Sequence, residues 1–209
     1  MRSVIILAGG SSTRFGRDKG LVFLGGKTLI ERAYESAMEV AKEVVVAVSS
    51  RKQREAYSRL LDECTFVVDE QRRIGPLSGL WSALGIVKAR KVAVVACDMP
   101  FVSGSVLNLF FELCVKQDAV IPRWPNGYIE PLHSVYDSAR CLTATSAALG
   151  QGCGNLRGMI CNLQNILHVS TEAIRAIQPK LAMFTNINTL GDLAKARRIL
   201  DTGPLRQSQ

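Results

Sequence analysis

The sequence predicts a single α/β domain built on a doubly wound, mostly parallel sheet. Short runs rich in Val and Ile alternate along the chain with longer segments of helical periodicity. One of the short runs, residues 92–96, is apolar without interruption, which is typical of a parallel strand that is buried on both faces. Because strand, helix and strand follow one another repeatedly, the pattern indicates helices on both sides of one sheet.

The first part of the chain supplies most of this pattern. Strands are expected over residues 3–8, 43–48, 65–68, 92–96 and 119–121, each bounded by turn-forming residues. Helices are expected over 29–41, 52–61, 77–88 and 106–116. Thr28 has the side chain of a helix N-cap, and Pro76 suits the first turn of the third helix.

After Pro122 the pattern is less regular. We expect a turn at 123–127, an extended segment at 128–136, a helix at 138–149 and a glycine-rich loop at 150–158 ahead of a short helix. A strand near 166–169 and a helix over 189–200 complete the fold. The chain contains no repeat or linker, so we predict one domain over 1–203 and a polar tail over 204–209.

Composition excludes several classes of protein. Hydrophobic residues make up 47% and charged residues 21% of the 209 residues, which excludes intrinsic disorder. The apolar run at 4–8 is far shorter than the ~18–20 residues of a membrane span, and two glycines follow it too soon for a secretory signal. We therefore expect a cytoplasmic protein with no membrane partner. Six cysteines without a CxxC pair are expected to be reduced thiols.

The net charge favours an anionic partner of small size. The chain has 26 Lys and Arg against 18 Asp and Glu, a formal charge of +8. These charges lie in short clusters with acids between them, without a polybasic tail or a zinc-finger spacing. We therefore expect no nucleic-acid partner, and a phosphorylated small molecule suits the balance.

The loop after the first strand has the composition of a phosphate cradle. It combines glycines, hydroxyls and cations in the order Gly9-Gly10-Ser11-Ser12-Thr13-Arg14-Phe15-Gly16-Arg17-Asp18-Lys19. Glycines let backbone N–H groups converge on oxyanions, and the cations add charge. The spacing fits neither a Walker A loop nor the dinucleotide-binding G-x-G-x-x-G motif. From composition alone, a turn-rich surface loop remains the alternative.

Two further loops are expected at the same edge of the sheet. Asp98 follows the apolar strand at 92–96, so its carboxylate is exposed at the strand tip, caps a helix or binds a cation. Asp69 precedes a Gly75-Pro76 turn that either presents N–H groups to a ligand or serves only as a turn. Ligands of open α/β sheets bind outside the carboxyl ends of the strands, which is where these loops lie.

Together these segments resemble the molybdenum cofactor guanylyltransferase family. The resemblance rests on L-A-G-G-x-S-x-R-F-G-x-D-K at 7–19, G-P-L-x-G at 75–79 and C-D-x-P at 97–100. Segments 130–136, 155–157 and 184–189 also resemble the family, so the likeness spans about residues 3–200. It implies the Rossmann-like fold of nucleotide-diphospho-sugar transferases.

The resemblance implies transfer of GMP from GTP to the terminal phosphate of molybdopterin, with release of pyrophosphate. It assigns GTP contacts to Leu7, Ala8, Gly9, Lys19 and Asp69, a Mg²⁺ ligand to Asp98, and phosphate contacts to Arg14. Arg14, Lys19 and Asp98 are the implied catalytic residues. Proteins of molybdenum insertion or molybdoenzyme maturation are implied as further partners.

His133 lies in the strand that the resemblance places beside the pterin, and it is a candidate contact to that substrate. His168 is expected to be an ordinary strand residue. The chain departs from the family at Ala47, where some members have asparagine, and at Phe15 and Leu190. No nucleotide contact is therefore assigned to Ala47.

Several alternatives remain open at this point. The same fold and first loop serve cytidylyl transfer to the pterin, guanylyl transfer to a cobamide precursor and nucleotidyl transfer to sugar phosphates. Gly9-Gly10 and Gly75-Pro76-Leu77 favour guanylyl transfer to molybdopterin. A non-catalytic nucleotide-binding domain is the alternative from another class. Such a domain does not need a metal-binding carboxylate, so the presence of Asp98 together with Arg14 and Lys19 speaks against this alternative.

Overall fold

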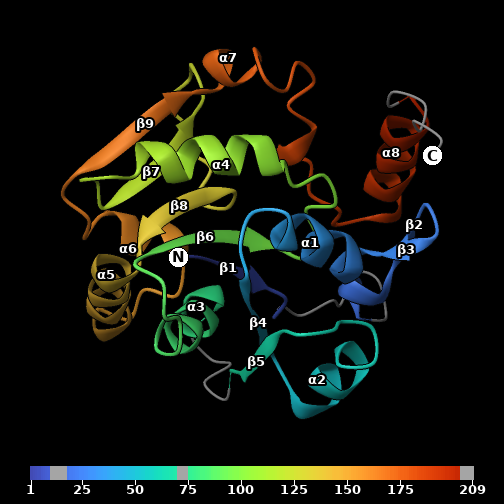
Figure 1. Cartoon of the computed structure of the whole chain (residues 1–209), viewed down its shortest axis with the longest axis horizontal. Helices are drawn as coiled ribbons and strands as arrows, with labels where there is room; N and C mark the ends of the chain where they lie inside the picture. Colours follow the sequence, from blue (N-terminus) through green and yellow to red (C-terminus); the bar gives the residue numbers. More distant parts are fainter. Residues whose placement is uncertain (10–17, 70–74, 203–209) are drawn as a thin grey trace.

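The computed structural model describes residues 1–9, 18–69 and 75–202, and within them one seven-stranded sheet carries helices on both faces (Figure 1). The sheet order is β5-β4-β1-β6-β8-β7-β9. The strands are β1 (Arg2–Leu7), β4 (Glu43–Val48), β5 (Thr65–Val68), β6 (Lys91–Ala96), β7 (Ala119–Arg123), β8 (Ser134–Asp137) and β9 (Ile166–Ser170). Only β8 runs antiparallel to its neighbours, β6 and β7, so the predicted mostly parallel sheet is confirmed.

Two apolar layers bury the sheet. One layer contains α1 (Leu29–Met38), α2 (Arg51–Tyr57), α4 (Gly104–Leu113) and α7 (Thr171–Ile174), and the other contains α3 (Pro76–Leu84), α5 (Ser138–Gly150) and α6 (Leu156–Ile160). In β1, Val4 and Ile6 face the first layer and Ile5 faces the second, and all three are fully buried. Burial of alternate residues on both faces explains why this strand is uniformly apolar.

A small third layer was not predicted. The strands β2 (Phe23–Leu24) and β3 (Lys27–Thr28) form an antiparallel hairpin that packs against α8 (Leu190–Asp201) around Val22, Leu24 and Ile187 (Figure 1). A 3₁₀ turn, η1 (Lys19–Leu21), leads into this hairpin, and a second one, η3 (Ala182–Phe184), precedes α8. The hairpin thereby packs the chain just after Lys19 against α8.

The first four predicted helices begin within two residues of the observed starts but extend three or four residues too far, whereas the predicted helices at 138–149 and 189–200 agree with α5 and α8 to within one residue. Thr28 forms a capping box with Glu31, and Pro76 is at the first position of α3. However, α1 ends at Met38 and α2 at Tyr57. Apolar residues that follow these ends, such as Val40 and Leu61, still pack against the sheet, so the apolar pattern continues where the helical backbone does not.

The region after Pro122 departs most from prediction. Of the predicted extended segment 128–136, only an isolated bridge between Arg123 and Ile129 and the start of β8 are strand-like. The predicted loop 150–158 ends early, because Asn155 caps α6 with its side chain. The predicted tail 204–209 lies outside the described residues.

The connections place a switch in strand order between β1 and β6. From β1 the chain proceeds outward to β4 and β5, and it then crosses to β6 on the other side of β1. Loops from the carboxyl ends of β1 and β6 therefore diverge and leave room between them. All six cysteines are free, and Cys97, Cys114 and Cys141 are buried. No helix in the described ranges is long and apolar enough to cross a membrane.

Candidate active site

A cavity of about 310 Å³ opens at the carboxyl ends of β1 and β6. Its wall combines the end of β1, the start of η1, the end of β6 and three later segments of the chain. The lining residues are Leu7, Ala8, Gly9, Lys19, Pro76, Ala96, Cys97, Asp98, Leu132, Leu156, Asn186 and Asn188.

Backbone hydrogen bonds hold the segments that follow β1 and β6 side by side. Cys97 N–H donates to the Leu7 carbonyl at 3.1 Å, and Ala8 N–H donates to the Ala47 carbonyl at 2.9 Å, so the sheet ladder continues to the edge of the cavity. Ile187 N–H donates to the carbonyl of Asp98 at 2.9 Å. Since Ile187 is buried against the hairpin, this bond brings its two neighbours, Asn186 and Asn188, to the cavity wall.

The Lys19 ammonium in the cavity wall contacts a carboxylate oxygen and an amide oxygen. Lys19 Nζ lies 2.9 Å from Asp98 Oδ2 and 2.7 Å from Asn188 Oδ1. The side chains of Lys19 and Asp98 are each 20% exposed, so the pair is shielded but open to solvent. A carboxylate and an amide oxygen are ligands that Mg²⁺ accepts, with phosphate and water completing its shell. In the described part of the chain no group of three or more His, Cys, Asp or Glu side chains could hold a metal ion.

Asp69 lies beside the cavity and does not line it. Its N–H donates to the Val48 carbonyl at 2.8 Å, which extends the β4–β5 pairing by one residue. The Ser78 hydroxyl, from the first turns of α3, lies 2.5 Å from Asp69 Oδ2 and donates to it. Gly75, which caps α3, has a positive φ of 83°, and a Cβ there would lie 2.7 Å from the Gly154 carbonyl oxygen, so only glycine fits this turn.

Five of the predicted site residues therefore meet in one cavity: Leu7, Ala8, Gly9, Lys19 and Asp98. Arg14 lies outside the described residues, as does Phe15.

His133 does not reach the cavity surface, so the structure corrects its assignment as a candidate substrate contact. Its side chain is fully buried, with its ring centroid 6.1 Å from that of Phe184. Burial away from solvent lowers the pKa of His133 to about 3. His168 lies within β9, as predicted.

Sequence reasoning missed part of the wall. Asn186 and Asn188 were noted only as part of a segment that opens the last helix, yet Asn188 contacts Lys19 directly. The N-x-N spacing could have indicated this, because alternate residues of an extended segment face the same side. Leu132 and Leu156 come from segments that no local pattern connects to the first loop.

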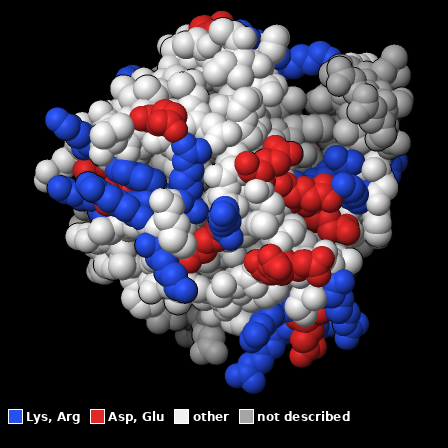
Figure 2. Space-filling view, in the orientation of Figure 1, with Lys and Arg blue, Asp and Glu red and all other residues white. Residues whose placement is uncertain are grey.

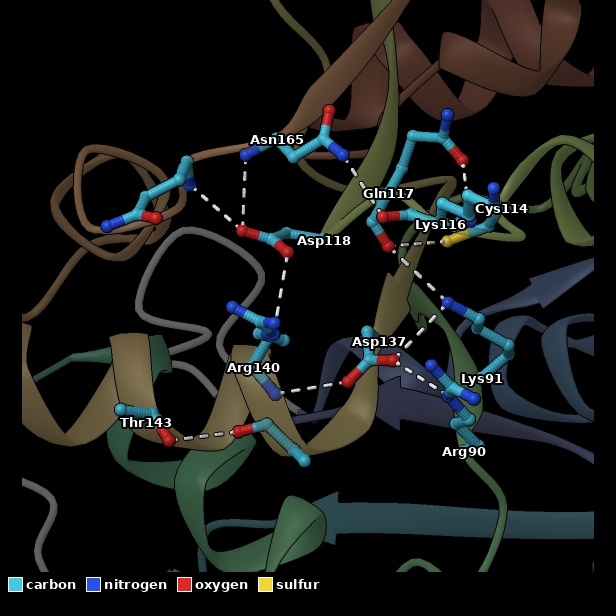
Figure 3. Close-up of polar contacts among 12 residues, drawn as sticks. Arg90, Lys91, Cys114, Lys116, Gln117, Asp118, Asp137, Arg140, Thr143 and Asn165 are labelled. Carbon is cyan, nitrogen blue, oxygen red and sulfur yellow. Dashed lines mark hydrogen bonds and ion pairs between the residues drawn. The ribbon is translucent and has the colours of Figure 1, made fainter.

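A second cavity, of about 380 Å³, lies near the opposite edge of the sheet between α5 and the loop before β9. Its polar wall belongs to a network around Asp118 and Asp137 (Figure 3). Asp118 Oδ2 accepts from the backbone N–H groups of Gln164 and Asn165, at 3.0 and 3.2 Å. Asp137 caps α5 through the Arg140 N–H and pairs with Lys91 and Arg90.

Figure 2 shows basic side chains gathered on the side of the molecule that carries β8 and α5, with acidic side chains between them. The cations Arg90, Lys91 and Arg140 are accounted for there by the carboxylates of Asp137 and Asp118. These ion pairs place both signs of charge at this edge of the sheet.

A family model and curated relatives are similar to this chain over most of its length. Residues 4–166 match the family model described as MobA-like NTP transferase domain. A probable molybdenum cofactor guanylyltransferase of Methanosarcina mazei is 36% identical over 198 residues, which cover 92% of this chain and 88% of that protein. One from Pyrococcus horikoshii is 32% identical, covering 90% of this chain and 95% of the relative.

Solved structures agree with these relatives. The molybdopterin-guanine dinucleotide biosynthesis protein A of Archaeoglobus fulgidus superposes with a TM-score of 0.80 at 30% identity, covering 96% of this chain and 99% of the other. The 2-C-methyl-D-erythritol 4-phosphate cytidylyltransferase of Thermus thermophilus shares the fold, with a TM-score of 0.69 at 18% identity and coverage of 96% and 98%.

Proposed function

Because the chain belongs to the family of MobA-like NTP transferase domains, we propose that it is a molybdenum cofactor guanylyltransferase. It transfers GMP from GTP to the terminal phosphate of molybdopterin and releases pyrophosphate. The observation that carries the proposal is the joining of Leu7–Gly9, Lys19 and Asp98 in one cavity at the switch point of the sheet. Nucleotides bind at this position in doubly wound folds.

The reaction needs positioning and charge neutralisation more than a protein nucleophile. The acceptor phosphate attacks the α-phosphorus of GTP, a bond to that phosphorus forms, and the bond to the β-phosphate oxygen breaks. Both reactants are polyanions, so the chain's own contribution is to hold them in line and to offset their repulsion. Lys19 is the described cation of the cavity wall suited to this, and its Nζ moves from the oxygens of Asp98 and Asn188 to the phosphates.

The residues around Lys19 also fit Mg²⁺. Asp98 Oδ2 and Asn188 Oδ1 already hold a cationic group between them, and both are hard oxygen ligands. We propose that these two side chains hold the metal ion, which when bound neutralises phosphate charge. Arg14 is proposed to contact the phosphates from the preceding loop.

Asp69 is proposed to hold the nucleoside end of GTP. A carboxylate can accept from the adjacent N1–H and N2–H groups of guanine, a pair of donors that cytosine lacks. The Ser78 hydroxyl holds one oxygen of Asp69, which orients the carboxylate. A site whose acceptors pair with the matching base rejects a base that leaves them unpaired.

Two further parts of the proposal concern the setting of the enzyme. We place it in the cytoplasm, on the argument from composition given above. Proteins of molybdenum insertion or molybdoenzyme maturation remain proposed partners.

The test is pyrophosphate release with each of the four nucleoside triphosphates, with and without molybdopterin. We expect release with GTP and acceptor together, and weaker binding of CTP, ATP and UTP by calorimetry. Equal or better binding of CTP would move the chain to cytidylyl transfer. GTP binding without any acceptor-dependent release would indicate a nucleotide-binding domain instead.

A further inference from the structure

We propose that Tyr57, a buried residue of α2, is a positioning residue for Lys19 and acts on it through Asp18. The inference rests on the proposed function, in which Lys19 contacts the triphosphate. Tyr57 lies neither in the cavity wall nor in any of the motifs by which the site was recognised. Its phenol forms the centre of a hydrogen-bond chain that connects Ala8, at the end of β1, with Asp18, which precedes η1.

The first half of this chain anchors the end of β1. Gln53 Nε2 donates to the Ala8 carbonyl and to the Tyr57 hydroxyl oxygen, both at 3.0 Å. Gln53 Oε1 accepts from the N–H of Ser49 at 2.8 Å and is also bonded to its hydroxyl. Gln53 is buried and every polar atom of its side chain has a partner, so its orientation is determined by the fold.

The second half reaches Lys19. The Tyr57 hydroxyl donates to Asp18 Oδ1 at 2.8 Å, and the same oxygen accepts from the Gly20 N–H at 2.9 Å. Asp18 thereby caps η1, whose first residue is Lys19. The Asp18 carboxylate thus accepts one hydrogen bond from Gly20, the residue after Lys19, and another from the Tyr57 hydroxyl. This sets the direction in which the Lys19 side chain leaves the backbone.

Packing leaves this arrangement little freedom. Tyr57 is fully buried, and a Cβ on Gly20 would lie only 2.0 Å from the Tyr57 hydroxyl oxygen. The glycine at position 20 therefore permits the close approach of η1 to α2. Burial raises the pKa of Tyr57 far above its ordinary value, so the phenol keeps the proton that it donates to Asp18.

The consequence is that α2 determines where the Lys19 ammonium lies relative to Asp98. A lysine side chain is long and flexible, so ordering it on binding costs conformational entropy. A rigid backbone at Lys19 reduces this cost, because part of the ordering is already present before the nucleotide binds. Without the Tyr57 hydroxyl, Asp18 and η1 lose one anchor, although the ring still fills its place in the core. Nucleotide binding should then weaken chiefly through Lys19.

The experiment is a double-mutant cycle on GTP affinity, measured by calorimetry with Mg²⁺ on the full chain. Tyr57→Phe should raise the Kd by about 3- to 10-fold, the loss expected for one hydrogen bond. Lys19→Ala should raise it by about 10-fold or more, as for a charged contact. In the Lys19→Ala background, Tyr57→Phe should change the Kd by less than about twofold, because residues that act as one unit are not additive.

Tyr34→Phe is the matched control. The Tyr34 hydroxyl likewise donates one hydrogen bond, in this case to the backbone carbonyl of Asp62, and Tyr34 is partly buried on α1 and is not among the residues that line the cavity. This variant should leave the Kd unchanged. Thermal midpoints of all four variants establish that each is folded at the temperature of measurement.

The outcomes separate the two proposals. If Lys19→Ala weakens binding and Tyr57→Phe does not, the inference is wrong while the proposed function stands. Additive losses, or an equal loss in Tyr34→Phe, would also overturn it, because Tyr57 would then act through general stability. If Lys19→Ala binds GTP as the wild type does, Lys19 does not contact the triphosphate and the inference fails with that assignment, whereas guanylyl transfer itself is decided by acceptor-dependent pyrophosphate release in the wild type.

Discussion

Charged residues have different partners at the two ends of the parallel strands, which we call the amino edge, where the strands begin, and the carboxyl edge, where they end. At the amino edge, the carboxylates of Asp118 and Asp137 accept hydrogen bonds from backbone N–H groups and form ion pairs (Figure 3). At the carboxyl edge, the Asp98 carboxylate pairs with a flexible side chain, that of Lys19. Both edges have a cavity, so a cavity alone does not distinguish a binding site from a structural cluster.

A charge that serves binding and a charge that serves stability differ in this fold by the groups that satisfy them. Backbone donors are held by secondary structure and cannot move to a ligand, so a carboxylate that they satisfy serves stability. A side-chain ammonium held by two side-chain oxygens can exchange its partners for phosphate oxygens at little cost in folding. The predictions below follow from this distinction.

The largest effect is expected for Asp98→Asn. The variant keeps the shape of the side chain and removes the charge proposed to hold Mg²⁺. Turnover, measured as Mg²⁺-dependent pyrophosphate release, should fall by about 10²–10³-fold, the usual cost of losing a preorganised electrostatic group. The thermal midpoint should change little, since the carboxylate is partly exposed and bonds no described backbone group. Near-normal turnover would refute the metal assignment.

Lys19→Ala and Arg14→Ala come next. Each removes a proposed phosphate contact and should weaken GTP binding or slow turnover by about 10- to 100-fold, with little effect on the free energy of unfolding. Steady-state kinetics and calorimetry on each variant measure this. Wild-type kinetics in both variants would show that the loop after β1, residues 9–19, does not bind the triphosphate.

Asp137→Asn should show the opposite behaviour. Asparagine still caps α5, but the ion pairs with Lys91 and Arg90 are lost, so unfolding should require about 2 kcal/mol less free energy at pH 7. Turnover at a temperature where the variant is folded should stay as in the wild type. A loss of turnover without loss of stability would show that Asp137 serves catalysis and not the stability of the fold.

The Asp137 effect should also depend on pH. Burial raises the pKa of Asp137, but hydrogen bonds from the Arg140 N–H, Arg90 and Lys91 outweigh burial and leave the pKa below its ordinary value of 3.8. A depressed pKa stabilises the fold above the unfolded value and ceases to do so as pH falls through the folded one. Urea unfolding of wild type and variant should therefore converge below about pH 4.

The smallest effect concerns His133. Because burial lowers its pKa to about 3 from 6.5, the unfolded chain gains a proton below pH 6.5 and the folded chain does not. Between pH 7.5 and 5.5 this group should cost roughly 1 kcal/mol of stability. His133→Phe keeps a ring against Phe184 and should remove that loss. An unchanged pH profile of unfolding would show that His133 is not buried as described.

The sequence predicts the regular half of the fold well. The strands at 43–48 and 65–68 have the predicted bounds, because uniformly apolar runs between turns admit little else. The hairpin β2–β3 was not predicted, and of the extended segment predicted at 128–136 only the end forms part of a strand, the antiparallel β8. Both are short, and their pairing depends on residues distant in sequence, such as Ala93 with Val135.

The candidate site divides in the same way. Residues in continuous motifs, such as Lys19 and Asp98, were found because their spacing from a strand end places them at one edge. Asn188, Gln53 and Tyr57 were not found, since their importance lies in contacts to other loops. No local pattern in α2 distinguishes a buried glutamine and tyrosine that serve the site from ordinary core residues.

The most direct test of the central claim is to map where GTP binds. Amide spectra of the ¹⁵N-labelled protein, recorded as GTP is added with Mg²⁺, report each backbone N–H separately. We expect shifts at Gly9, Gly20 and Asp98, at the carboxyl edge, and unchanged signals at Asp118 and Arg140. Shifts confined to the amino edge, with Gly9 and Asp98 unaffected, would contradict the claim.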